Sequence, residues 1–169
     1  GADGLYRVSG ESGPELVYRH RDRLGRSIGV LVRAIAEDHQ GHLWLSLLGN
    51  GLVRWDPAST EALHVQEFPG VPASLPEDVI NSLMVDRSGL LWAGGQIRGV
   101  AVADPQGARF QYLVDLDTRR GWVDGNSARV MLQADAGRVW VGTDSDGLKR
   151  IDLHTGVFED FGAPLLAAL

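Results

Sequence analysis

Three tryptophans, Trp44, Trp92 and Trp140, recur at a constant interval of 48 residues. A glycine precedes each tryptophan by three residues, another glycine follows it by seven, and an aspartate follows it by twelve. These companions are Gly41, Gly89 and Gly137, then Gly51, Gly99 and Gly147, and then Asp56, Asp104 and Asp152. A register held at so many positions is an internal repeat, and a period of about 40–50 residues indicates a repeat array or a propeller.

Each repeat contains four short apolar runs separated by turn residues, which is typical of an all-β unit. In the second full repeat we expect strands over residues 79–85, 90–94, 99–104 and 109–115. In the first turn, Asp86 can bond to nearby backbone N–H groups and Gly89 can adopt a left-handed conformation. The same structural role is expected of Asp38, Gly41 and Gly137.

The tryptophan-bearing strands are apolar at successive residues, as in Leu91-Trp92-Ala93. Continuous apolarity indicates a strand covered on both faces, as in a sheet stacked between two neighbours. A four-stranded antiparallel unit of this kind is a propeller blade. The sequence therefore predicts an all-β fold, a partial β-propeller of about 3.5 four-stranded blades, with the repeat tryptophans as packing residues rather than sugar-stacking ones.

The whole chain is expected to be one propeller fragment. Residues 1–19 would form the C-terminal half of a blade, followed by blades over residues 27–68, 76–115 and 124–161. Because residues 4–7 align with residues 51–54 and 147–150, we expect an excerpt of a longer protein that opens in mid-repeat. Its open ends would expose apolar sheet faces and strand edges, so self-association is expected.

The composition excludes several classes of function. The net charge of −6 is spread over interleaved acids and bases, so no basic stripe is present to bind nucleic acid. The absence of cysteine excludes disulfides, thiolate zinc sites and a cysteine nucleophile. No apolar run is long enough to cross a bilayer, so membrane attachment would require other parts of a parent chain.

No catalytic, metal or cofactor site is predicted. The five histidines are dispersed without metal-ligand spacing, at His20, His39, His42, His64 and His154, and are expected at solvated turns or edges. The segment Asp144-Ser-Asp-Gly147 resembles part of a calcium loop but lacks the further ligands and the distal glutamate, so a structural turn is expected. No G-x-S-x-G nucleophile motif occurs.

The segment Val139-Trp-Val-Gly-Thr-Asp-Ser-Asp-Gly-Leu-Lys-Arg-Ile-Asp152 resembles the two-component regulator propeller repeat. The resemblance covers nearly the whole chain in three copies. Departures from the pattern occur at Ala134, where Asp is usual, at Ser46-Leu47 and Gly94-Gly95, where Gly-Thr is usual, and at Val102, where a basic residue is usual.

The resemblance implies a periplasmic sensor domain, the extracytoplasmic part of an inner-membrane histidine kinase or diguanylate cyclase. Such a segment would be non-catalytic in itself and would bind a small molecule or a saccharide. Two alternatives stay open, namely a propeller enzyme of the streptogramin-lyase type and a scaffold propeller that binds proteins.

Trp122 does not belong to the repeated set of tryptophans and lies in the segment that crosses between the second and third blades. In propellers the blade-crossing segments and the turns between second and third strands share one face, the usual ligand face. That face is predicted to carry Trp122, Arg98, Arg119, Arg120, Asp124, Asn50, Asp144 and Asp146. An exposed aromatic residue beside arginines and carboxylates suits a saccharide or a small acid, and Trp122 and Arg98 are the leading candidates.

Overall fold

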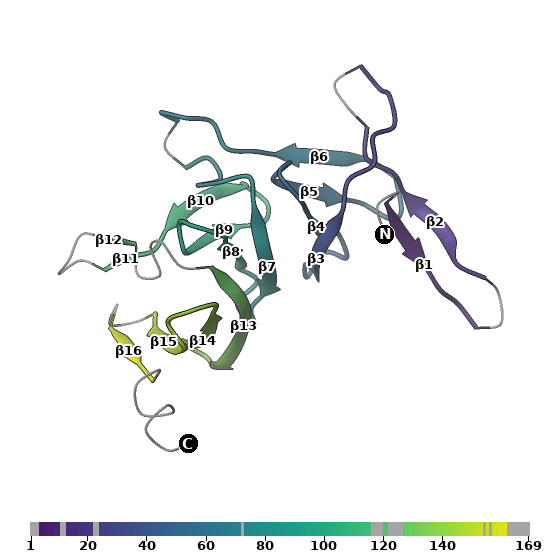
Figure 1. Ribbon diagram of the computed structural model, residues 1–169. Coiled ribbons are helices and arrows are strands. Elements are labelled where there is room, and N and C mark those ends of the chain that lie inside the picture. The colour runs from purple at the N-terminus through teal and green to yellow at the C-terminus, as the bar shows by residue number, and fades with distance from the viewer. Residues whose placement is uncertain are drawn as a thin grey trace.

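The computed structural model describes residues 4–10, 13–21, 24–71, 73–115, 120–121, 127–153, 155 and 157–161. In these residues the strands pair in antiparallel fashion to form three four-stranded sheets and two two-stranded sheets. Figure 1 shows the four-stranded sheets following one another around an arc. The predicted all-β fold, a partial propeller, is confirmed. Within the same residues no helix is long and apolar enough to span a membrane.

Each four-stranded sheet is one blade, and its strands pair in chain order. The first blade contains β3 (Val32–Glu37), β4 (Leu43–Leu47), β5 (Leu52–Trp55) and β6 (Ala62–Val65). The second contains β7 (Ile80–Val85), β8 (Leu91–Gly95), β9 (Val100–Asp104) and β10 (Arg109–Tyr112). The third contains β13 (Ala128–Asp135), β14 (Arg138–Thr143), β15 (Leu148–Asp152) and β16 (Phe158–Asp160).

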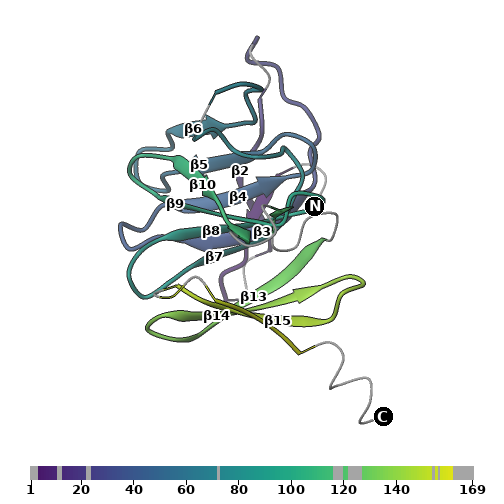
Figure 2. The ribbon, with the colours of Figure 1, turned by 90° about the vertical axis from the view of Figure 1, so that its left-hand side faces the viewer.

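The first strands of the blades lie next to one another, β3 beside β7 and β7 beside β13. Figure 2 shows the second blade in front of the first and the third blade below both. The same irregularity of pairing recurs at the start of each of these inner strands, between Val32 and Ala34, Ile80 and Ser82, and Ala128 and Val130. The 48-residue period is thus a property of the backbone as well as of the side chains.

The repeat tryptophans pack between blades where a following blade is present. Trp44 is fully buried in one apolar cluster with Leu91 and Ala103 of the second blade. Trp92 is fully buried in another with Val139 and Ile151 of the third blade. Burial of so large an apolar surface at each junction supplies much of the stacking free energy.

Trp140 is only half-buried, since its sheet face is the last in the stack. The ring of Phe161 meets it edge-on, with centroids 4.9 Å apart. The guanidinium of Arg150 lies 5.1 Å from the centre of the indole, which is within range of a cation–π contact. The chain's own side chains therefore partly cover this ring.

The first turn of the third blade differs from its two counterparts. Gly41 and Gly89 have positive φ angles of 85° and 92°, whereas Gly137 is not among the positive-φ glycines. Ala134 occupies the usual aspartate position, and β13 continues to Asp135, which pairs with Arg138. Gly137 therefore lies in a turn, as expected, but without the left-handed backbone of Gly41 and Gly89, because this hairpin is shorter.

Two short hairpins flank this stack. β1 (Leu5–Arg7) and β2 (Glu15–Tyr18) pack on the free side of the first blade, where Tyr18 and Trp55 have ring centroids 5.9 Å apart. β11 (Val114–Asp115) pairs with β12 (Arg120–Gly121). The strand expected over residues 109–115 therefore ends at Tyr112, and its last two residues belong to a hairpin in the crossing segment.

Candidate functional site

The turns between second and third strands share a face with the segments that cross between blades. One backbone hydrogen bond joins each turn to the crossing segment beside it, and it recurs every 48 residues. Its donors and acceptors are Leu48 N to Leu31 O at 3.0 Å, Gln96 N to Val79 O at 3.0 Å, and Asp144 N to Ser127 O at 3.2 Å. In the described residues, each of these three turns therefore lies beside the end of the crossing segment that leads into its own blade.

Arg98 lies on this face, in the turn between β8 and β9, and lines a cleft of about 280 Å³. The crossing segment between the first and second blades forms one wall and contributes Phe68 and Val71. The outer strand β10 forms the other wall with Phe110 and Tyr112. The cleft thus combines apolar and aromatic walls with one guanidinium, the usual mixture in a small-molecule site.

A buried carboxylate fixes the backbone of Arg98. Glu77 accepts hydrogen bonds from the backbone N–H groups of Ile97 at 3.0 Å and Arg98 at 2.7 Å. Only 8% of Glu77 is exposed, so these charge-assisted bonds offset the cost of burying the carboxylate. A Cβ at Gly95 would lie 2.0 Å from Glu77 Oε1, which explains why glycine occupies that position.

The same crossing segment is tied to both blades. The backbone carbonyl of Asp78 accepts the N–H of Gly51 in the first blade at 3.0 Å. Its carboxylate accepts the N–H of Glu67 at 2.7 Å. The carbonyl of Ala73 accepts the N–H of Phe110 in the second blade at 3.0 Å. A ligand in the cleft would therefore contact a segment that bridges two blades.

The side chain of Arg98 is 58% exposed, and its nearest acidic partner is Glu67 at 3.7 Å. An exposed pair at this distance contributes little to stability. The guanidinium can therefore exchange Glu67 for a polar group of a ligand at small cost.

Three other predicted site residues lie in different turns from Arg98. Asn50 lies in the turn between β4 and β5, where its amide donates to Leu48 O at 3.3 Å. Asp144 and Asp146 lie in the turn between β14 and β15. In the part of the chain that the structure describes, these three residues are not among those that line the Arg98 cleft.

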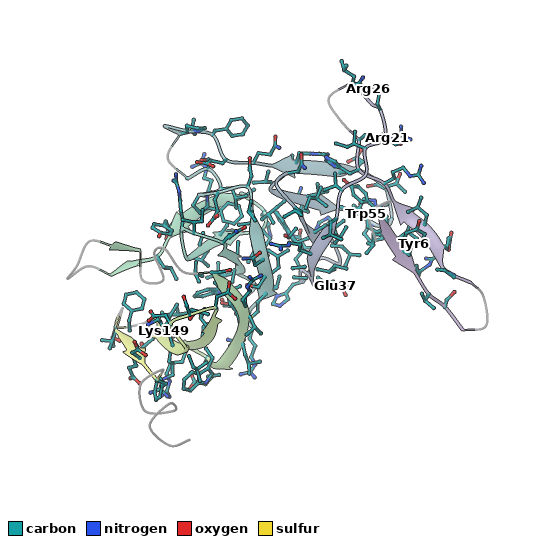
Figure 3. The ribbon with its side chains drawn as sticks, in the orientation of Figure 1. Tyr6, Arg21, Arg26, Glu37, Trp55 and Lys149 are labelled. Atoms are coloured by element: carbon teal, nitrogen blue, oxygen red, sulfur yellow. The ribbon has the colours of Figure 1, made fainter. Side chains whose placement is uncertain are left out.

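Both aspartates in the third-blade turn have cationic partners. Asp144 pairs with Arg129 at 2.5 Å, and the hydrogen bond from that guanidinium lowers the pKa of Asp144. Asp146 pairs at 2.5 Å with Lys149, whose side chain is labelled in Figure 3. Burial opposes the charge on Lys149, but the bonds to Asp146 and Asp160 raise its pKa. These carboxylates therefore hold the turn to its own blade, as expected of a structural turn.

Four of the predicted site residues belong to the third crossing segment. Trp122, Arg119 and Asp124 lie outside the described residues. Arg120 is placed by its backbone in β12, opposite Asp115, and its side chain is not described.

A set of inner-strand residues on this face was missed by sequence reasoning. Residues 33, 81 and 129 occupy the same repeat position in β3, β7 and β13. Arg33 donates to the side-chain carbonyl of Asn81, and the Asn81 amide donates to Ser127 Oγ at 2.6 Å. Polar residues repeated at 48-residue spacing within apolar strands were the signal that could have revealed them. Glu77 offered no such signal, because no acid recurs at its repeat position.

The histidines differ in part from expectation. His20 is buried rather than solvated, stacks on His64 with centroids 4.8 Å apart, and shares a hydrogen bond of 3.2 Å with the Tyr18 hydroxyl. His42 contacts the Asp38 carboxylate at 3.2 Å, and His154 lies outside the described residues. Within those residues, no group of three or more His, Asp or Glu side chains is placed to hold a metal.

Comparison with known proteins gives similarity at the level of structure. No family profile and no curated protein matches the sequence. The chain superposes on the extracellular domain of BT3049 from B. thetaiotaomicron, assigned as a hybrid two-component system, with a TM-score of 0.68 and 20% identity, over 82% of this chain and 19% of that one. For the extracellular domain of BT4673 from the same organism, likewise assigned, the TM-score is 0.68 and the identity 18%, over 95% and 20% of the two chains.

A Bacteroides thetaiotaomicron protein of unknown function matches with a TM-score of 0.54 and 16% identity, over 79% of this chain and 35% of that one. The chain spans about a fifth of the length of the two extracellular domains. At these identities the likeness establishes a shared fold. It agrees with the resemblance that the repeat residues carry.

Proposed function

We propose that this chain is a ligand-sensing propeller segment from the extracytoplasmic part of a bacterial membrane-bound signal-transduction protein. Its fold is that of two extracellular domains assigned to hybrid two-component systems, and its repeat residues independently resemble the two-component regulator propeller repeat. The segment itself is non-catalytic, and a kinase or cyclase domain elsewhere in the parent chain would supply the output.

The observation that carries the sensing function is the bridged cleft at Arg98. A ligand there would bind to a guanidinium on a rigid turn and to a crossing segment bonded to two successive blades. Ligand binding in the cleft could therefore change the contacts between two blades and so produce a structural change in the segment. The guanidinium and the aromatic walls suit a small acid or a saccharide bearing polar groups.

A propeller enzyme or a protein scaffold is less well supported. A lyase of the streptogramin type would bring a histidine and a carboxylate together on the ligand face. The pair formed by His42 and Asp38 lies instead at the turn between β3 and β4, at the opposite end of the strands. A scaffold would bind a protein rather than a small ligand at the Arg98 face.

The test is calorimetric titration of the chain with a panel of saccharides and small carboxylic acids. We expect at least one compound to bind, and Arg98→Ala to weaken that binding at least tenfold. Arg87→Ala is the matched control, because Arg87 lies in the turn between β7 and β8 at the other end of the blade. Binding that is unaffected by Arg98→Ala, or equally reduced by Arg87→Ala, would contradict the proposed site.

A further inference from the structure

A second cleft lies between β2 and the outer strands of the first blade, and its volume is about 430 Å³. This volume lies in the range of about 300–1,000 Å³ that is usual for ligand pockets. One side of the cleft is the end of β2 and the residues after it, and the other side is formed by β5, β6 and the loop between them. Its lining includes Tyr18, Arg19, Arg21, Trp55, Ala62 and His64.

This cleft has the same build as the cleft at Arg98. Two of its lining residues stand 48 positions before two that line the Arg98 cleft, namely Ala62 before Phe110 and His64 before Tyr112. In both clefts the opposite side is the segment that follows the preceding strand, which is β2 here and β6 there. A cleft therefore forms at two successive blade junctions, with different side chains in each.

The two clefts differ in charge. In the Arg98 cleft the guanidinium has Glu67 beside it, at 3.7 Å. The second cleft contains two arginines, Arg19 and Arg21, both exposed, and no carboxylate is among the described residues that line it. This described lining therefore has an excess of positive charge, although the whole chain has a net charge of −6. Such a local excess attracts anions.

The backbone after β2 holds Arg21 in place at the edge of the cleft. Arg21 forms an isolated antiparallel bridge with Ser27, and Ile28 N donates to His20 O at 3.1 Å. One nitrogen of the Arg21 guanidinium donates to Gly25 O at 2.7 Å. A guanidinium has five N–H donors, so most of them remain available to a ligand. Arg21 is labelled in Figure 3, as is Trp55 on the other side of the cleft.

The floor of the cleft is aromatic, and one histidine joins it to the rim. Tyr18 and Trp55 are buried. His20 shares a hydrogen bond of 3.2 Å with the Tyr18 hydroxyl, and its ring stacks on that of His64 with centroids 4.8 Å apart. His64 is itself exposed, so a ring nitrogen can donate to a ligand. Because an apolar floor lowers the local dielectric, hydrogen bonds made above it are stronger than in open solvent.

We propose that this cleft binds a small organic dianion, with Arg19 and Arg21 binding its two acidic groups and His64 donating a further hydrogen bond. Guanidinium and carboxylate form two parallel hydrogen bonds, which gives both strength and orientation. The apolar floor and the volume of the cleft favour a carbon chain between the acidic groups, and so a dicarboxylate rather than inorganic phosphate. This site does not involve the Arg98 cleft, so either site can fail its test without the other.

The probes are linear dicarboxylates from malonate to adipate, titrated by calorimetry into the Arg98→Ala chain so that the Arg98 cleft does not contribute. We expect at least one of them to bind. Its monoamide, which lacks one negative charge, should bind at least tenfold more weakly, and inorganic phosphate should also bind more weakly. The NMR signals of the His64 ring and the Trp55 indole should shift when the dicarboxylate is added.

Two substitutions in the same background test the cleft in different ways. Arg21→Ala removes one guanidinium and should weaken dicarboxylate binding at least tenfold. Ala62→Phe fills the cleft with the side chain that the second blade has at this repeat position, Phe110, and should weaken binding as much without removing a charge. Arg87→Ala, in the turn between β7 and β8, is the control and should leave binding unchanged.

Circular dichroism checks that each variant folds. The proposal is overturned if no dicarboxylate binds, or if the monoamide or phosphate binds as tightly. It is also overturned if the folded Arg21→Ala and Ala62→Phe chains bind as well as their parent, or if Arg87→Ala weakens binding as much as Arg21→Ala does.

Discussion

Asp38 and Asp86 each link a turn to the buried tryptophan six residues later. The Trp44 indole donates to Asp38 Oδ2 at 3.1 Å, and the Trp92 indole donates to Asp86 Oδ2 at 2.9 Å. The second oxygen of Asp86 accepts the N–H groups of Ser88 and Leu90 at 2.8 and 3.0 Å. One carboxylate thus closes the turn and satisfies a buried indole N–H that would otherwise lose its hydrogen bond to water.

The protonation of these carboxylates should control stability in acid. Burial alone would raise the pKa of Asp86, but the bonds from Ser88, the Trp92 indole and Leu90 N hold that pKa below its ordinary value. The same balance lowers the pKa of Asp38. The stabilisation is therefore full above the unfolded-state pKa of about 3.9 and is lost as the pH falls through the lower folded-state pKa.

Asp86→Asn should lower the free energy of unfolding at neutral pH by about 1–3 kcal/mol, because the neutral amide cannot replace every bond of the carboxylate. Urea unfolding at pH values from 7 to 3 should also show a flatter pH dependence than in the unsubstituted chain. Asp104→Asn is the control, since Asp104 is exposed and accepts the N–H of Gln106 at 2.9 Å without contacting an indole. An unchanged acid profile in Asp86→Asn would contradict this role.

At the scale of the blade, the position in the stack decides what a repeat residue does. Arg54 and Arg150 share a repeat position. Arg54 donates across the junction to Pro105 O in the second blade at 3.1 Å, whereas Arg150 covers Trp140 of its own blade and pairs with Glu159 at 2.5 Å. The same residue type therefore joins blades within the stack and covers an indole at its last face.

Trp92→Ala should destabilise the chain by about 3–5 kcal/mol, since it removes a fully buried aromatic ring between two blades. Trp140→Ala is its matched control and should cost clearly less, because Trp140 is half-buried and contacts Phe161 and Arg150. Thermal unfolding of both variants makes the comparison. Equal costs would show that burial between blades does not distinguish the two positions.

The sequence could predict those features that recur with the repeat. The 48-residue period gave the blades, their strands and the turn residues, because each copy supports the assignment of the others. It could not give the hairpin of β11 and β12 or the contact of Glu77 with the Arg98 turn, since neither recurs. Ser46 stands where glycine is usual, and only the three-dimensional packing explains it. Its hydroxyl donates to Ile80 O on the second blade. From the second blade, the hydroxyl of Ser82 donates in a similar way to Ala128 O on the third blade, at 2.9 Å.

At the scale of the whole chain, the outer side of the third blade is an exposed apolar surface. Val130 and Leu132 on β13 are 59% and 64% exposed, and Trp140 lies opposite Leu132 on the adjacent strand. Two adjacent exposed aliphatic residues beside a half-buried indole form a patch suited to association. We propose that the chain self-associates through this surface.

Sedimentation at micromolar concentration should detect a reversible dimer or larger species. Leu132→Glu should shift the chain to a monomer, because it places a charge in the centre of the patch, while Ile35→Glu should leave the association unchanged. A folded chain that sediments as a monomer without substitution would contradict the proposal.

The hydrogen bond that joins each turn to its crossing segment has a consequence for how such a chain changes length. Since Leu48, Gln96 and Asp144 make the same bond at equivalent points, a recombination between any two of these points adds or removes one complete unit. The blades on either side of the new junction then meet through an interface of the same type. Such a chain therefore lengthens or shortens by whole units, while an insertion of one residue within a strand would shift the register of the bonds that follow in that strand.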